Sequence, residues 1–111
     1  MLARLVRLEA RGEPADGLQA VAEVVLNRMV SSRWSHANTV EAVINDNRWG
    51  PQFAVAGNIW TDRATPTSAE WTAVDNALNG PNVLGMDYFF FRKTPVTENE
   101  IVWIGVHAFS K

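Results

Sequence analysis

A long apolar stripe between Leu18 and Met29 constrains this chain more than any other feature. Apolar side chains recur there at helical spacing, at Leu18, Val21, Ala22, Val25, Leu26 and Met29. Such a stripe is one face of an amphipathic helix packed against a core. We predict a largely buried helix from about Pro14 to Val30. Pro14 suits a first helical turn, which needs no N–H at that position, and Asp16 offers an alternative start.

Length and composition restrict the class of protein. The chain has 111 residues, enough for one domain with a single core, and we treat 1–111 as one domain excised from a longer chain. The net charge of -2 and the lack of a basic block argue against nucleic acid as a partner. No apolar run is long enough to insert into a membrane, and we expect no export signal within these residues. There is no cysteine, which excludes disulfides and thiolate chemistry.

Three further helices are expected from their start and stop signals. The first runs from the beginning of the chain to about Ala10 or Arg11, where Gly12 and Pro14 end it. Asn38-Thr-Val-Glu41 resembles a capping box that opens a short helix. Thr67-Ser-Ala-Glu70 is a second capping box, and Asn79-Gly80-Pro81 ends the helix that it opens.

After Gly80 the pattern changes from helical to β. Tyr88 to Phe91 and Ile101 to Ile104 are short β-rich runs, which we interpret as an antiparallel hairpin, with a third strand near His107 to Phe109. Several helices followed by a small antiparallel sheet indicate an α+β domain.

Glu9 is the candidate for acid chemistry. Leu2, Leu5 and Val6 form an apolar stripe whose next position is Glu9. Partial burial there raises the pKa of a carboxyl group and keeps it protonated, ready to donate a proton to a leaving group. Periodicity alone favours the alternative, a glutamate at a helix end that reaches solvent or pairs with Arg4, Arg7 or Arg11.

Several motifs together resemble a known family. They are Glu9-Ala-Arg-Gly-Glu13, Gly17, Ala20-Val-Ala22, Val24-Val-Leu-Asn-Arg28, Gln52-Phe53, Tyr88-Phe-Phe-Phe91 and Ile104-Gly-Val-His-Ala-Phe109. In this order they are similar to the spore-cortex-lytic cell wall hydrolases, relatives of lytic transglycosylases and lysozyme-like muramidases. The resemblance implies a lysozyme-like fold, no metal or other cofactor, and a catalytic acid at Glu9. The family often has an asparagine after its aromatic run, where this chain has Phe91-Arg92.

The same resemblance and the residue types suggest further site residues. Gln52 and Phe53 match a pair expected to line the cleft, and Tyr88 is a candidate to hydrogen-bond a sugar or Glu9. Glu13 is expected in the substrate site as well. For its structural role we favour a cap or salt bridge with Arg11 or Arg28 over a part as nucleophile. His107 is expected to be a hydrogen-bonded histidine near the sheet.

The leading hypothesis is cleavage of the peptidoglycan glycan strand between N-acetylmuramic acid and N-acetylglucosamine. A lytic transglycosylase needs one group, which acts first as acid and then as base, and Glu9 fits that demand better than a paired-carboxylate scheme. The alternatives are a non-catalytic peptidoglycan-binding module and an amidase that cuts the peptide stem. We expect a monomer that acts outside the cytoplasm.

Overall fold

The computed structural model describes residues 1–34, 36–46, 59–93 and 101–111. Helices come first along the chain: α1 (Leu2–Ala10), α2 (Ala15–Val30), α3 (Val40–Asn45) and α4 (Ser68–Asn79). Two short 3-10 turns, η1 (Ser32–Trp34) and η3 (Asp62–Ala64), lie between them. The strands follow: β1 (Phe90–Arg92), β2 (Ile101–Ile104) and β3 (His107–Ser110). This order confirms the α+β prediction.

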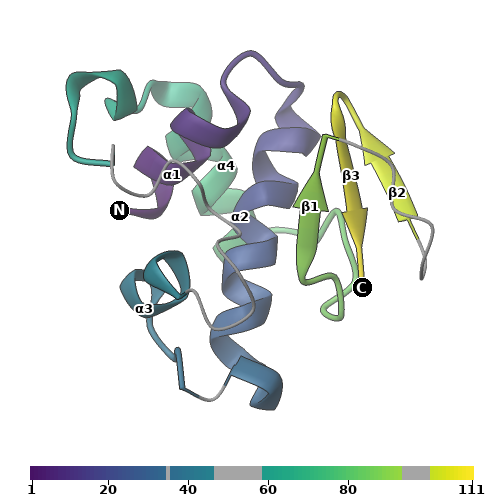
Figure 1. Ribbon diagram of the computed structural model, residues 1–111. Helices are drawn as coiled ribbons and strands as arrows, with labels where there is room; N and C mark the ends of the chain where they lie inside the picture. The colour runs from purple at the N-terminus through teal and green to yellow at the C-terminus, as the bar shows by residue number, and fades with distance from the viewer. Residues whose placement is uncertain (35, 47–58, 94–100) are drawn as a thin grey trace.

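Helix α2 is the buried centre of the domain. It packs against α1, α3, α4 and β1, and lies between the other helices and the sheet (Figure 1). Val21 and Val25 have no exposed surface, and Leu26 is half-buried at the edge of the core. Both the apolar stripe and the helix that it predicts are confirmed. The helix begins at Ala15, directly after Pro14 at the N-cap.

A second stripe on α2 is polar, and it holds the chain that returns from α4 to the sheet. The buried Glu23 carboxylate accepts hydrogen bonds from the main-chain N–H groups of Val83 and Leu84, at 2.8 and 2.9 Å. One turn further on, Asn27 Nδ2 donates to the carbonyls of Gly85 and Tyr88. These bonds satisfy buried polar groups and fix the path into β1.

The two predicted capping boxes differ in outcome. At α4, Glu70 accepts from the Thr67 N–H at 2.7 Å, as the sequence predicts. At α3, the cap is Thr39, whose hydroxyl accepts from the Ala42 N–H at 3.1 Å. The prediction placed Asn38 in this role and is wrong by one residue, because both residue types can cap a helix.

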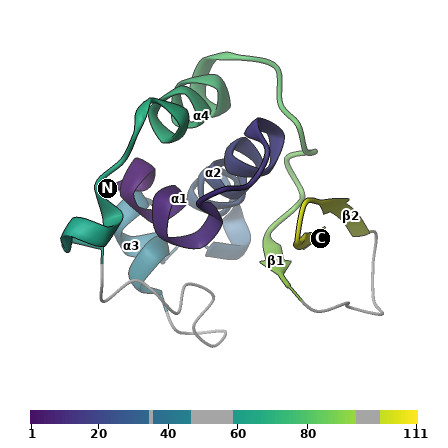
Figure 2. The same cartoon turned by 90° about the horizontal axis from the view of Figure 1, so that it is seen from above.

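The strand order corrects the predicted hairpin. The sheet has the order β1-β3-β2, so β1 and β2 do not pair with each other, and each pairs antiparallel with β3. The hairpin is β2–β3, closed by a two-residue turn whose first residue, Gly105, has φ of +59°. Glycine adopts this left-handed conformation without strain, which permits the tight turn. Seen from above, the sheet flanks the helices on one side (Figure 2).

We predict that Val25→Ala lowers the free energy of unfolding by about 2 kcal/mol, because it removes two buried methyl groups and leaves a cavity. Urea denaturation measures the change. Val30→Ala is the matched control on the same helix: Val30 is 64% exposed, and its truncation should cost less than about 0.5 kcal/mol. Equal losses in the two variants would contradict the buried position of α2.

Candidate active site

Glu9 lies in the last turn of α1, which ends where the chain turns toward α2. Gly12 has φ of +86°, in the left-handed region, and the Glu13 N–H bonds the Ala10 carbonyl at 3.0 Å. The helix therefore stops before Glu13, as predicted. Because Glu9 and Glu13 do not share a helix, the geometry of a helical carboxylate pair does not apply to them.

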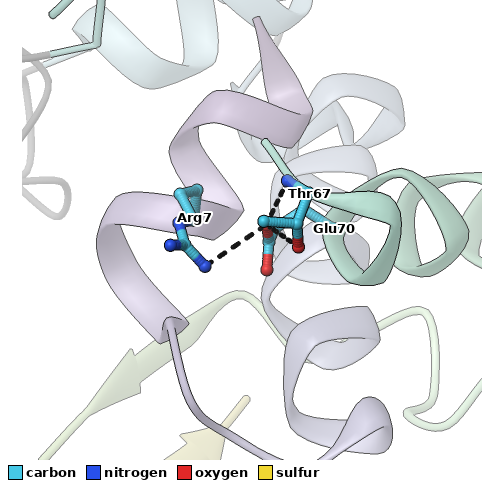
Figure 3. A network of polar contacts seen from close by, with 3 residues as sticks. All are labelled: Arg7, Thr67 and Glu70. Atoms are coloured by element: carbon cyan, nitrogen blue, oxygen red, sulfur yellow. Dashed lines mark hydrogen bonds and ion pairs between the residues drawn. The ribbon is translucent and has the colours of Figure 1, made fainter. Parts of the chain in front are cut away.

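The arginines of α1 and its loop do not pair with Glu9. Arg4 donates to the carbonyls of Ile59 and Thr61 and stacks on Trp60. Arg7 points toward α4, where its Nη1 lies 3.7 Å from the Glu70 carboxylate (Figure 3). Arg11 is exposed and forms no ion pair with any residue that the structure describes. None of these three arginines therefore forms the ion pair with Glu9 that the alternative interpretation requires.

Burial disfavours the ionised form of the Glu9 carboxyl group. Its Oε1 is buried and accepts no hydrogen bond from the part of the chain that is described. Burial raises the pKa of Glu9 from 4.5 to about 7, against the opposing effect of the Lys93 charge. The position near the C-terminal end of a helix also disfavours a negative charge. A carboxylic acid near neutral pH can donate a proton and, once ionised, take one back.

Glu13 has a different environment, against the β2–β3 turn. Its Oε1 accepts a 2.7 Å hydrogen bond from the Val106 N–H. The same oxygen lies 3.7 Å from His107 Nδ1. A Cβ placed on Gly105 would fall 2.2 Å from it, so any larger residue there would have to displace the Glu13 carboxylate. Glu13 therefore anchors the hairpin to the α1–α2 loop, whereas the prediction had named Arg11 or Arg28 as its partner.

His107 is buried on the inward face of β3, with 2% of its surface exposed. Burial lowers its pKa more than the Glu13 carboxylate raises it, so the imidazole is neutral at pH 7. Its ring packs edge-on against Phe91, with centroids 5.3 Å apart. The prediction of a hydrogen-bonded histidine is wrong for Nδ1, which has no hydrogen-bond partner among the described residues.

Of the other predicted site residues, the structure describes Tyr88, whereas Gln52 and Phe53 lie outside the described residues. Tyr88 is buried, and its main chain is bonded by Asn27. Asn27 lies about 18 Å along α2 from the start of that helix, at 1.5 Å per residue. Tyr88 thus sits toward the other end of α2 from Glu9, and a contact with sugar stays a prediction.

Arg28 buttresses the end of α2. Its Nε donates to the Phe89 carbonyl at 2.7 Å, and its guanidinium lies over the buried Trp34 ring at 4.7 Å. Burial lowers the pKa of Arg28 to about 10. Of the four described tryptophans, only Trp34 is buried, and the others are exposed: Trp60, Trp71 and Trp103.

Lys93 was missed by the sequence reasoning. Its charge acts on both Glu9 and His107, which lie on different elements. The only available signal was its place directly after β1, where the resemblance to the family breaks down. Within the described ranges, no group of three or more His, Cys, Asp or Glu side chains could hold a metal ion. None of the described helices is long and apolar enough to cross a membrane.

These features define a class of protein before any comparison. A helical domain with a small antiparallel sheet, and a glutamic acid whose pKa is raised by burial, has the arrangement of lysozyme-like domains that act on glycans. The chain belongs to the cell wall hydrolase family, whose model matches residues 12–110. The match begins after Glu9 and so does not test the role of that residue.

Individual relatives agree with this family. The chain is 36% identical to a spore cortex-lytic enzyme of Oceanobacillus iheyensis and 37% identical to one of Bacillus cereus. All of this chain aligns, but it spans only 40% and 43% of the length of these relatives. Among solved structures it is similar to the catalytic domain of the germination-specific lytic transglycosylase SleB from Bacillus anthracis. That similarity has 33% identity and a TM-score of 0.78, and it covers 99% of this chain and 90% of the other.

The catalytic domain of the Bacillus cereus SleB protein is a second similar structure. It has 33% identity and a TM-score of 0.79, with 99% of this chain and 86% of that chain covered. Both likenesses confirm the predicted lysozyme-like α+β fold over nearly the whole chain.

We predict that Gly105→Ala destabilises the protein more than Gly12→Ala. Both glycines have a positive φ, which costs an alanine about 1–2 kcal/mol. At Gly12 a Cβ would meet nothing within 4 Å, whereas at Gly105 it would overlap the Glu13 carboxylate. Thermal or urea unfolding of the two variants measures the difference. Equal destabilisation would show that the Glu13 contact does not hold the turn.

We also predict that Glu9→Gln stabilises the protein at pH 8 but not at pH 4. The pKa of Glu9 is raised to about 7 on folding, so its stabilising contribution is present below 4.5 and is lost as the pH rises through about 7. Glutamine carries no charge and avoids that loss. Urea midpoints at the two pH values measure the effect, with the exposed Glu41 as control in Glu41→Gln. A gain that is the same at both pH values would refute the burial argument.

Proposed function

We propose that this chain cleaves the glycan strand of peptidoglycan between N-acetylmuramic acid and N-acetylglucosamine, as a lytic transglycosylase with Glu9 as its single acid and base. The observation that carries the proposal is the raised pKa of Glu9, about 7, at a carboxyl group without an ion-pair partner among the described residues. The cell wall hydrolase family and the similarity to the catalytic domain of a lytic transglycosylase support it.

The proposed reaction has two steps at one carboxyl group. First, protonated Glu9 gives its proton to the glycosidic oxygen, and the bond from that oxygen to C1 of the muramoyl residue breaks. The Glu9 carboxylate then takes the proton of the muramoyl C6 hydroxyl, and the oxygen of that hydroxyl bonds to C1. This closes a 1,6-anhydro ring, returns Glu9 to its acid form and consumes no water.

Glu13 has a supporting place in this scheme. Its carboxylate is occupied by the Val106 N–H and lies beside His107, so it is not positioned by these contacts as a second acid or nucleophile. A one-carboxylate reaction does not need it in either role. We propose that Glu13 holds the β2–β3 turn in place near the substrate.

The names of the curated relatives suggest the setting. Both are spore cortex-lytic enzymes, and we propose cortex peptidoglycan as the substrate, degraded during germination. This polymer lies outside the cytoplasm, so the proposed activity implies action there. The monomeric state expected from the sequence stays a prediction.

Mutation of Glu9 tests the proposal. Glu9→Gln should lower kcat on purified peptidoglycan by about 10²–10⁴-fold or more, because an amide cannot donate the proton. The control variant Glu41→Gln, at an exposed residue, should leave the rate unchanged. Glu13→Gln should lose less activity than Glu9→Gln. Mass spectrometry of the wild-type products should show 1,6-anhydro-muramic acid ends.

Two outcomes would overturn the assignment. If folded Glu9→Gln still cleaves at near wild-type rate, Glu9 is not the acid. If Glu13→Gln is folded and inactive while Glu9→Gln is active, the role moves to Glu13. Reducing muramic acid ends would keep the glycan-cleaving activity but replace ring closure by attack of water.

A further inference from the structure

Lys93 is an exposed cation at the end of β1. It follows directly after β1 and forms no ion pair with any residue in the described ranges. The other described lysine, Lys111, contacts Asp87 at 3.1 Å. Because Lys93 is exposed, a ligand can reach its long side chain.

The strand register places Lys93 on the inward face of the sheet. Phe91 pairs with Phe109, and Arg92 pairs with Ala108, so one further step brings Lys93 opposite His107. Side chains alternate between the two faces of a strand, which puts Lys93 on the same face as Phe91. That face is the one that carries His107, whose ring packs on Phe91. Arg92 lies on the opposite face and is exposed.

The electrostatics agree with this placement. Lys93 lowers the pKa of Glu9, on α1, and that of His107, on β3. A charge that acts on both groups lies near the end of α1 as well as near the rim of the sheet. The other charged group facing His107 is Glu13, which the β2–β3 turn already occupies. Lys93 is therefore the cation at the edge of the site that holds the proposed acid.

The chemistry of the substrate offers a matching group. Each muramoyl residue bears a lactyl ether that ends in a carboxyl group, either free or amide-linked to a peptide stem with carboxylates of its own. The chain as a whole, with net charge -2, does not attract such an anion. A nearby ammonium group compensates for this and orients the muramoyl residue.

We propose that Lys93 binds a carboxylate of the muramoyl residue whose glycosidic bond is cleaved, and thereby selects that residue over an N-acetylglucosamine. This inference rests on the proposed function, since it assumes that a glycan strand of peptidoglycan occupies the site beside Glu9. It assigns to Lys93 a binding role that neither the family match nor the names of the relatives specify.

Steady-state kinetics on three defined substrates test the assignment. The substrates are glycan strands with intact peptide stems, strands whose stems have been removed so that the lactyl carboxylate is free, and the same stem-free strands with that carboxylate converted to an amide. The variants are Lys93→Met, Lys93→Arg and, as a control with the same loss of charge, Arg92→Met. Circular dichroism confirms that each variant is folded.

For Lys93→Met we expect KM to rise about 3–10-fold on strands that carry the recognised carboxylate, as for one solvent-accessible ion pair, and kcat to change less than KM. The amidated strands should show the higher KM already with the wild type. Lys93→Arg should retain a low KM, and Arg92→Met should behave as the wild type. The alkaline limit of activity should also move to higher pH in Lys93→Met, because the pKa of Glu9 rises without the lysine charge.

The outcomes separate the two levels of the proposal. A low KM on stem-free strands would identify the lactyl carboxylate as the group that Lys93 binds. A low KM only on stem-bearing strands would identify a carboxylate of the peptide stem instead. Equal KM values on all three substrates, or equal effects of Lys93→Met and Arg92→Met, would overturn the role of Lys93 while cleavage persists. If the wild type cleaves none of the strands, the proposed function itself fails.

Discussion

Hydrogen bonds from one side of α2 to the returning main chain determine the shape of this domain. Glu23 receives two N–H groups of the segment after α4, and Gln19 donates both to Glu23 and to the Pro81 carbonyl. Asn27 and Arg28 continue the same attachment up to Phe89. A buried carboxylate without such donors would be strongly destabilising, so the sequence of α2 requires this segment at this place. Strand β1 begins where the attachment ends, and its position sets the rest of the sheet.

The sheet in turn decides how two similar carboxylates differ. Glu9 and Glu13 are four residues apart, in one motif, and both lie partly buried near the end of α1. The β2–β3 turn supplies Glu13 with an N–H donor. Glu9 is buried without any hydrogen-bond donor to its Oε1 from the described residues. The environments of the two carboxyl groups, and not their residue type, separate the structural role of Glu13 from the proposed proton transfer at Glu9.

The sequence predicted what depends on local order and missed what depends on distant main-chain atoms. The helix Ala15–Val30 follows from a stripe with period 3.6, and the end of α1 follows from Gly12. The burial of Glu9 was visible as the next position of a stripe. The strand order was not predicted, because three short β-rich runs can pair in more than one way. The turn residue Gly105 offered a signal for the β2–β3 hairpin, since a glycine-containing pair between two β runs is typical of tight hairpins.

Glu13 illustrates the limit of sequence reasoning. Nearby arginines looked like its partners, but its hydrogen-bond donor is 93 positions away along the chain. The polar stripe of Gln19, Glu23 and Asn27 was present at helical spacing. Its partners, however, are backbone groups that carry no side-chain signature. Polar residues at such spacing beside an apolar stripe indicate a buried attachment, although not to which segment.

The pKa of Glu9 bears directly on whether one carboxyl group can serve both steps of the proposed reaction. An ordinary glutamate, with a pKa near 4.5, is almost fully ionised at neutral pH and has no proton to give. Burial without any compensating charge would favour the acid still more and make ionisation after the first step costly. Here burial raises the pKa and Lys93 opposes it, and the result is about 7. Near that value the acid and its conjugate base differ little in free energy at neutral pH, so the group can give a proton and recover one within a single turnover. The balance depends on the sheet holding Lys93 close to α1, which links the hydrogen bonds of α2 to the chemistry at Glu9.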